Sequence, residues 1–169
     1  ILTGADLSNS ILAGVDLSVK FPYARVGSQM VILHVLVDLT GTILTGADLS
    51  NSILAGVDLS GKDLTGTILT GADLSNTDLS NAILTNVNLE NATLENAKLL
   101  DTNLDSANLT NTDLRFVLLV DANLSNAILT GADLTNAVLT GSILTGSDLE
   151  NAVLTNAILN CVGHPICIE

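Results

Sequence analysis

Leucine recurs at every fifth position of this chain from Leu39 to Leu159, without one exception. The same period is present near the N-terminus, at Leu2, Leu7, Leu12 and Leu17. On an α-helix, leucines five residues apart would spiral around every side, and on a flat β-strand successive leucines would face opposite ways. A five-residue period therefore fits neither element, and the chain must turn once in every repeat.

The residues around each leucine indicate where that turn lies. A small residue stands two places before most leucines, and the residue between them is mostly Asp, Asn, Ile or Val. The second residue after the leucine is Gly or Asn at 20 of the 25 positions from 41 to 161; the exceptions are Asp101, Ser106, Phe116, Asp121 and Cys161. Gly and Asn tolerate the positive φ that the third residue of a type II turn requires. Each repeat is thus predicted to be a short extended segment followed by a corner.

Four such corners close a square coil of about 20 residues, and coils of this kind stack at the strand spacing of ~4.8 Å. The sequence therefore predicts an all-β fold, a parallel β-solenoid of about seven coils with type II turns at most corners. We expect one solenoid over residues 1–161, with an insertion at about 19–36 and a non-repeat tail at 162–169. Because aromatic residues make up only 2% of the chain, stacked leucines and small residues must fill the interior.

Units such as "ADLSN", "ADLTN", "ANLTN" and "ANLSN" resemble the A(D/N)Lxx signature of pentapeptide-repeat proteins. The resemblance covers the whole chain except roughly residues 19–36 and 162–169. It implies a right-handed quadrilateral β-helix. Most members of this family, which is abundant in photosynthetic bacteria, have no assigned biochemical role. One branch binds DNA gyrase by imitating the shape and charge of duplex DNA, usually as a C-terminal dimer.

The net charge of −13 comes from 18 acidic residues against five basic ones. Such a surface cannot neutralise phosphates, which argues against direct binding to nucleic acid or to anionic membranes. The longest apolar run, at 31–37, is far shorter than the ~18 residues of a membrane span. We expect a soluble protein of the cytoplasm, or of the periplasm or thylakoid lumen if a signal peptide has been removed.

The insertion interrupts the repeat with basic and aromatic residues. Two structures are open: a loop that protrudes from a corner, with Leu39 resuming the side after Leu17, or an irregular coil. The protruding loop is favoured because charged residues and proline suit no interior. The insertion is also the candidate partner-binding loop, although an inert hairpin is an equally open interpretation. The candidate contact residues are Lys20, Phe21, Tyr23, Arg25 and His34.

Stacking by 20 residues predicts columns of outward side chains. One column should contain Asp38, Asp58, Asp78 and Lys98. The same column then becomes apolar, at Leu118 and beyond. Exposed apolar patches often mark interfaces, so we expect a homodimer contact here. The alternative is that Ile and Val at outward positions merely suit a β-surface. The candidate self-association patch comprises Leu100, Phe116, Leu118, Val120, Val138 and Ile158.

Three further residues depart from the repeat. Lys62 stands at an inward position, so its stem should pack inside while its amine reaches solvent. Cys161 and Cys167 are the only cysteines, and a disulfide or two free thiols are both open. A metal site with His164 has weak support, because three ligands lack a fourth.

No nucleophile–base pair, phosphate-binding loop or metal-ligand set accompanies the repeats. The sequence therefore predicts a non-enzymatic structural or protein-binding solenoid without a cofactor, which acts through its outward faces and the insertion. The alternative is a DNA mimic that binds a DNA topoisomerase such as gyrase. That alternative needs a continuous acidic stripe, whereas Asn, Ile and Lys interrupt every acidic column.

Overall fold

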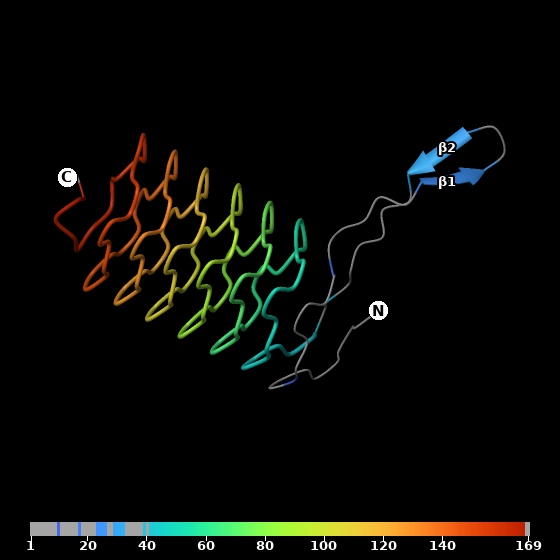
Figure 1. Cartoon of the computed structure of the whole chain (residues 1–169), viewed down its shortest axis with the longest axis horizontal. Helices are drawn as coiled ribbons and strands as arrows, with labels where there is room; N and C mark the ends of the chain where they lie inside the picture. The colour runs from blue at the N-terminus through green and yellow to red at the C-terminus, as the bar shows by residue number, and fades with distance from the viewer. Residues whose placement is uncertain are drawn as a thin grey trace.

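The computed structural model describes residues 10, 17, 23–26, 29–32, 39 and 41–167. From residue 41 onward the chain winds into stacked coils (Figure 1). Each side of a coil pairs in parallel with the side 20 residues later, from Asp48 with Ile68 to Val138 with Ile158. Four sides of five residues therefore make one coil, and the fold is a right-handed quadrilateral β-solenoid. The described part contains no helix long and apolar enough to span a membrane.

Each described corner from Leu39 to Ala157, except the one between Leu99 and Thr102, is a tight turn closed by one backbone hydrogen bond. At a typical corner the N–H of Ala47 donates to the carbonyl of Leu44 over 2.9 Å. The third residue of the turn has a positive φ at every fifth position from Gly41 to Asn156, as a type II turn requires. The four non-glycine, non-asparagine exceptions in this range have the same conformation, with φ between 54° and 59°: Asp101, Ser106, Phe116 and Asp121.

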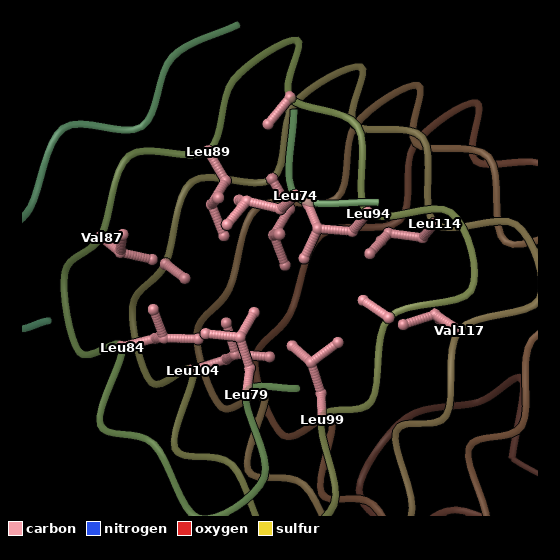
Figure 2. Packing of buried hydrophobic residues seen from close by; sticks show 14 of the residues in the cluster. Leu74, Leu79, Leu84, Val87, Leu89, Leu94, Leu99, Leu104, Leu114 and Val117 are labelled. Atoms are coloured by element: carbon pink, nitrogen blue, oxygen red, sulfur yellow. The ribbon is translucent and has the colours of Figure 1, made fainter. Parts of the chain in front are cut away.

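Leucines and small residues fill the interior in layers (Figure 2). Every repeat leucine from Leu39 to Leu144 is at most 3% exposed. Where threonine takes the small inward position, its hydroxyl donates to a leucine carbonyl of the preceding coil, as Thr102 does to Leu79 over 2.9 Å. Lys62 uses the equivalent acceptor: its Nζ donates to the carbonyl of Leu39 over 2.5 Å. The half-buried amine is therefore bonded to the backbone, and the expectation that it simply reaches solvent was incomplete.

The N-terminal repeats join the stack in a shifted register. A leucine N–H in the regular stack donates to the residue 19 positions later, as Leu54 does to Asp73, but Leu17 donates to Ile53. Leu17 thus occupies the side directly before Leu39. The two leucines are 22 positions apart instead of five, so 17 residues between them are additional to the winding. This register is the one expected for a loop that protrudes from a corner, with Leu39 resuming the side after Leu17.

Two strands lie within the insertion. Strand β1, Tyr23–Val26, pairs antiparallel with strand β2, Gln29–Ile32. Tyr23 is opposite Ile32 and Val26 is opposite Gln29, so the two strands form a hairpin. Figure 1 shows this hairpin apart from the stacked coils.

The C-terminal tail leaves the repeat at Cys161, which does not share the left-handed corner conformation. Val162 pairs with Ile143, 19 positions away instead of 20. A disulfide joins Cys161 to Cys167, and Ile166 and Cys167 pack against the core. The leucines of the last coil remain only partly buried, so the tail covers part of this end of the stack.

Two adjacent leucines provide a test of which side chains face inward. Leu119→Ala removes a side chain with no exposed surface and should lower the free energy of unfolding by about 2–5 kcal/mol. Leu118→Ala changes the half-buried outward neighbour and should cost about 1 kcal/mol or less. Urea denaturation measures both, and equal losses would contradict the assignment of faces.

The disulfide should stabilise only the end of the stack. Replacing both cysteines by serine removes a short closed loop, which contributes about 2 kcal/mol at most. We expect faster hydrogen exchange at the Leu144 amide, which donates to Val162, and at the Gly141 amide, which donates to Asn160. The Leu84 amide, in the middle of the stack, is the internal control. Unchanged exchange at Leu144 would show that the tail needs no cross-link.

Candidate functional site

One face of the solenoid changes from charged to apolar along its length. Its outward column, which we call the Leu118 face, is linked by successive bridges. Lys98 Nζ lies 3.4 Å from the Asp78 carboxylate, so the charged half contains an ion pair. Asp38, which was expected in the same column, lies outside the described residues. The described column comprises Asp58, Asp78, Lys98, Leu118, Val138 and Ile158.

An apolar patch covers the C-terminal half of this face. Phe116, Leu118 and Val120 are alternate residues of one coil and span the face from corner to corner. Phe116 and Ile158 are each 48% exposed, and the other members are half-buried. We define the apolar patch as the six residues predicted for self-association, which the structure brings to one face: Leu100, Phe116, Leu118, Val120, Val138 and Ile158.

Phe116 combines exposure with an unfavourable backbone conformation. Its φ of 58° lies in the left-handed region, which costs roughly 1–2 kcal/mol for a residue with a Cβ. The equivalent corners of the neighbouring coils carry Asn96 and Asn136, which tolerate this region better. The turn requires this conformation at every corner, so the feature that the fold does not require is the choice of phenylalanine at this one.

An ion-pair cluster borders the patch beside Phe116. Arg115 donates from Nε to Asp113 Oδ1 over 2.8 Å and from Nη2 to Asp113 Oδ2 over 2.7 Å, and Nη2 lies 3.3 Å from Glu95. The hydrogen bonds from Arg115 hold the pKa of the Asp113 carboxyl below its ordinary value, and the carboxylates raise the pKa of Arg115. Stacking brings Glu95 to Arg115, because the two residues are 20 positions apart, whereas Asp113 lies two residues before Arg115 in the same repeat.

Two carboxylates border the opposite edge of the patch. Asp101 and Asp121 directly follow Leu100 and Val120 and stand at successive corners of the same edge. Neither carboxylate has a hydrogen bond or an ion pair among the described residues. Sequence reasoning noted both only as exceptions to the Gly/Asn rule; their spacing of 20 could have identified them as neighbours.

The other candidate residues lie elsewhere. Tyr23 and Arg25 belong to β1, whereas Lys20, Phe21 and His34 fall outside the described residues. In the tail, His164 Nδ1 accepts a hydrogen bond from the Ile166 N–H over 3.3 Å. Within the described ranges, no group of three His, Cys, Asp or Glu side chains is placed to hold a metal ion.

Five-residue sides, left-handed corners and stacked leucines together define a repeat protein of the quadrilateral β-solenoid class. The family model described as pentapeptide repeats matches in eight copies, over residues 36–71, 72–111, 107–146 and 118–156. The chain therefore belongs to the pentapeptide-repeat family, and no enzymatic family is indicated. A comparison with curated proteins finds no match.

Solved structures of the same family resemble the chain over most of its length. HetL, which is involved in heterocyst differentiation regulation in the cyanobacterium Nostoc sp. strain PCC 7120, is 24% identical. The match covers 100% of this chain and 93% of HetL, with a TM-score of 0.38. Rfr23 from the cyanobacterium Cyanothece 51142 is 28% identical, with coverages of 94% and 91% and a TM-score of 0.26. QnrB1, a plasmid-mediated fluoroquinolone resistance protein, is 18% identical, with coverages of 92% and 84% and a TM-score of 0.38.

The lowered pKa of Asp113 predicts a pH-dependent contribution to stability. A carboxyl with a depressed folded-state pKa stabilises the fold above its unfolded pKa and loses that effect as pH falls through the folded value. Asp113→Asn should therefore lower the urea midpoint at neutral pH, and the difference should shrink as the pH falls below the ordinary pKa of an Asp carboxyl. The loss should stay under about 1 kcal/mol, because both side chains of the pair are partly exposed to solvent.

The matched background is Arg115→Gln, which removes the cation. In that background, Asp113→Asn should have a smaller pH-dependent cost, because the guanidinium is absent while the backbone N–H of residue 115 still donates to the Asp113 carboxylate. A cost that is independent of pH in the wild-type background would contradict this role of the ion pair.

Proposed function

We propose that this pentapeptide-repeat protein is a non-enzymatic, protein-binding solenoid whose contact surface is the Leu118 face. The observation that carries the proposal is the apolar patch, where outward aliphatic side chains and an exposed phenylalanine replace the polar residues of the same column. Apolar patches rimmed by polar groups are characteristic of protein–protein contacts. The rim here consists of Asp101 and Asp121 on one side and the Arg115 cluster on the other.

The rigidity of the scaffold supports a binding role. The coil that carries Phe116 and Leu118 is bonded on both sides: Leu99 N–H donates to the Leu118 carbonyl, and Leu119 N–H donates to the Val138 carbonyl, each over 2.8 Å. The backbone that carries the patch side chains is therefore held in place before a partner arrives, which reduces the entropy lost on binding. Flat walls of this kind suit contact surfaces better than catalysis, which requires converging titratable groups in a concave site.

The insertion is a second proposed contact element. Its hairpin of β1 and β2 carries Tyr23 and Arg25, and its flanking sequence adds Lys20, Phe21 and His34. Hairpins that extend from a rigid scaffold are common recognition elements. We assign the insertion a role in partner choice that is separate from the Leu118 face.

The DNA-mimic alternative has less support from the described faces. A mimic of duplex DNA needs regularly spaced carboxylates, yet the Asp113 face reads Ile53, Asp73, Thr93, Asp113, Asp133 and Val153. Arg115 and Lys98 further neutralise two acidic positions. A gyrase supercoiling assay with the purified chain tests this alternative, and inhibition at micromolar protein would favour it over the protein-binding role proposed for the Leu118 face.

Site-specific photo-crosslinking tests the proposed function. A benzophenone amino acid is placed at position 118, on the patch, and in a matched variant at position 83, where Ile83 is 43% exposed on another face. Irradiation in cells of the source organism should give a discrete protein adduct from position 118 and not from position 83. The adduct should disappear with Phe116→Asn. Equal adducts from both positions, or none from position 118, would contradict a specific contact surface.

A further inference from the structure

We propose that the apolar patch binds a short basic segment of a partner protein, in which lysines or arginines alternate with aliphatic or aromatic residues. The proposal rests on the protein-binding function above and adds the chemistry of the partner. Its basis is the position of two unpaired carboxylates, Asp101 and Asp121, along one edge of the patch.

The corners that carry the two carboxylates are adjacent in the stack, and each directly follows a residue of the patch. Asp101 N–H donates to the Val120 carbonyl over 3.0 Å, which fixes the corner of Asp101 against the coil of Asp121. Both residues are exposed, with φ values of 54° and 55°. Corners of successive coils are about 4.8 Å apart, and like charges at that spacing repel each other. A cation placed between them relieves this repulsion.

Within residues 41–167, no cation is left to pair with these two carboxylates. Residues 41–167 contain fourteen carboxylates and three cations. Each of the three has a partner within the chain: Lys62 donates to the Leu39 carbonyl, Lys98 pairs with Asp78, and Arg115 pairs with Asp113. Asp101 and Asp121 are therefore complementary to a positive charge that a partner brings, and this charge would also steer the association.

The size of the patch favours a short segment over a second solenoid. From Leu100 to Ile158 it spans three coil spacings, or about 14 Å, and from Phe116 to Val120 it spans four residues, or about 13 Å. The resulting area of roughly 200 Å² is far below the ~800 Å² that each partner contributes to a stable interface. A peptide segment whose aliphatic side chains contact Leu118 and Val138 and whose cation meets the Asp101–Asp121 edge fits these dimensions.

Three short synthetic peptides serve as probes of the full chain. One alternates lysine with leucine, one alternates glutamate with leucine, and one alternates lysine with serine. Binding is measured by fluorescence anisotropy of labelled peptide, and the contact surface is located by chemical-shift changes at Leu118 and Val120. The lysine–leucine peptide should bind, and the other two should bind at least about tenfold more weakly because each lacks one of the two required properties.

The variants use residues that the repeat already carries at the same corners. Asp101→Asn with Asp121→Asn introduces the residue that Asn81 already provides at the same edge. Phe116→Asn introduces the residue found at the equivalent corners Asn96 and Asn136. The corners of both variants should therefore form normally. The double carboxylate variant should weaken lysine–leucine binding about fivefold, and Phe116→Asn should weaken it further. The matched control is Asp63→Asn with Asp148→Asn, which removes two charges from other faces and should change affinity less than about twofold.

Three outcomes would overturn the proposal. The first is equal loss of affinity in the carboxylate variant and in the matched control, which would mean that net charge alone attracts the peptide. The second is tighter binding of the glutamate–leucine peptide at Leu118. The third is a wild-type dimer in sedimentation that Leu118→Asp dissociates, which would make a second copy the occupant. In the last two cases the Leu118 face still binds protein, whereas failure of the crosslink from position 118 would refute the proposed function itself.

Discussion

The backbone hydrogen bonds between coils are the interaction on which the rest of the structure depends. A side of the solenoid is too short to be stable alone, so its N–H and carbonyl groups are satisfied only by the coils before and after it, as Leu54 donates to Asp73 and Asp73 to Ser52. This ladder requires a corner after every third extended residue. The positive φ at positions 41 to 156 supplies that corner, and the buried leucines then follow from the geometry.

The same constraint explains why so much of the fold could be predicted. A strict five-residue leucine period with Gly or Asn at the corners admits one way of winding, so the square coil, the 20-residue columns and the inward leucines follow from sequence alone. Because the columns follow too, the six patch residues could be assigned to one face. The bidentate Arg115–Asp113 pair and the Lys62 hydrogen bond could not, since they depend on side-chain rotamers that a repeat pattern leaves free. The register of Leu17 could not be predicted, and a protruding loop and an irregular coil both stayed open. The reason is that the 22 positions from Leu17 to Leu39 nearly match the 20 residues of a full coil.

The coils differ from one another mainly in their outward side chains. Backbone and core are nearly identical from coil to coil, so differences between the faces come from the outward column and the corners. On the Leu118 face these positions change from Asp58 and Asp78 to Leu118 and Val138, and at one corner an aromatic residue occupies a conformation that favours Asn. Departures from the repeat that carry an energetic cost, such as Phe116, are the positions on which the proposed contact surface rests. Asp101 and Asp121 are also departures that carry an energetic cost, since Asn at both corners would avoid the repulsion between their carboxylates.

Residues 1–18 and 43–60 are identical in sequence, yet Leu17 and its copy Leu59 do not lie on the same side of the solenoid. Leu17 stacks below Ile53 on the Asp113 face, whereas its copy Leu59 lies behind the Leu118 face. Leu17 and Leu59 are therefore one quarter turn apart around the coil, although both pack against the core. In such a molecule, the gain or loss of one five-residue repeat leaves the core intact. It moves the outward side chains of all preceding repeats to the adjacent face of the solenoid. Recombination within the gene can therefore generate new outer surfaces in one step, with no change to the buried residues.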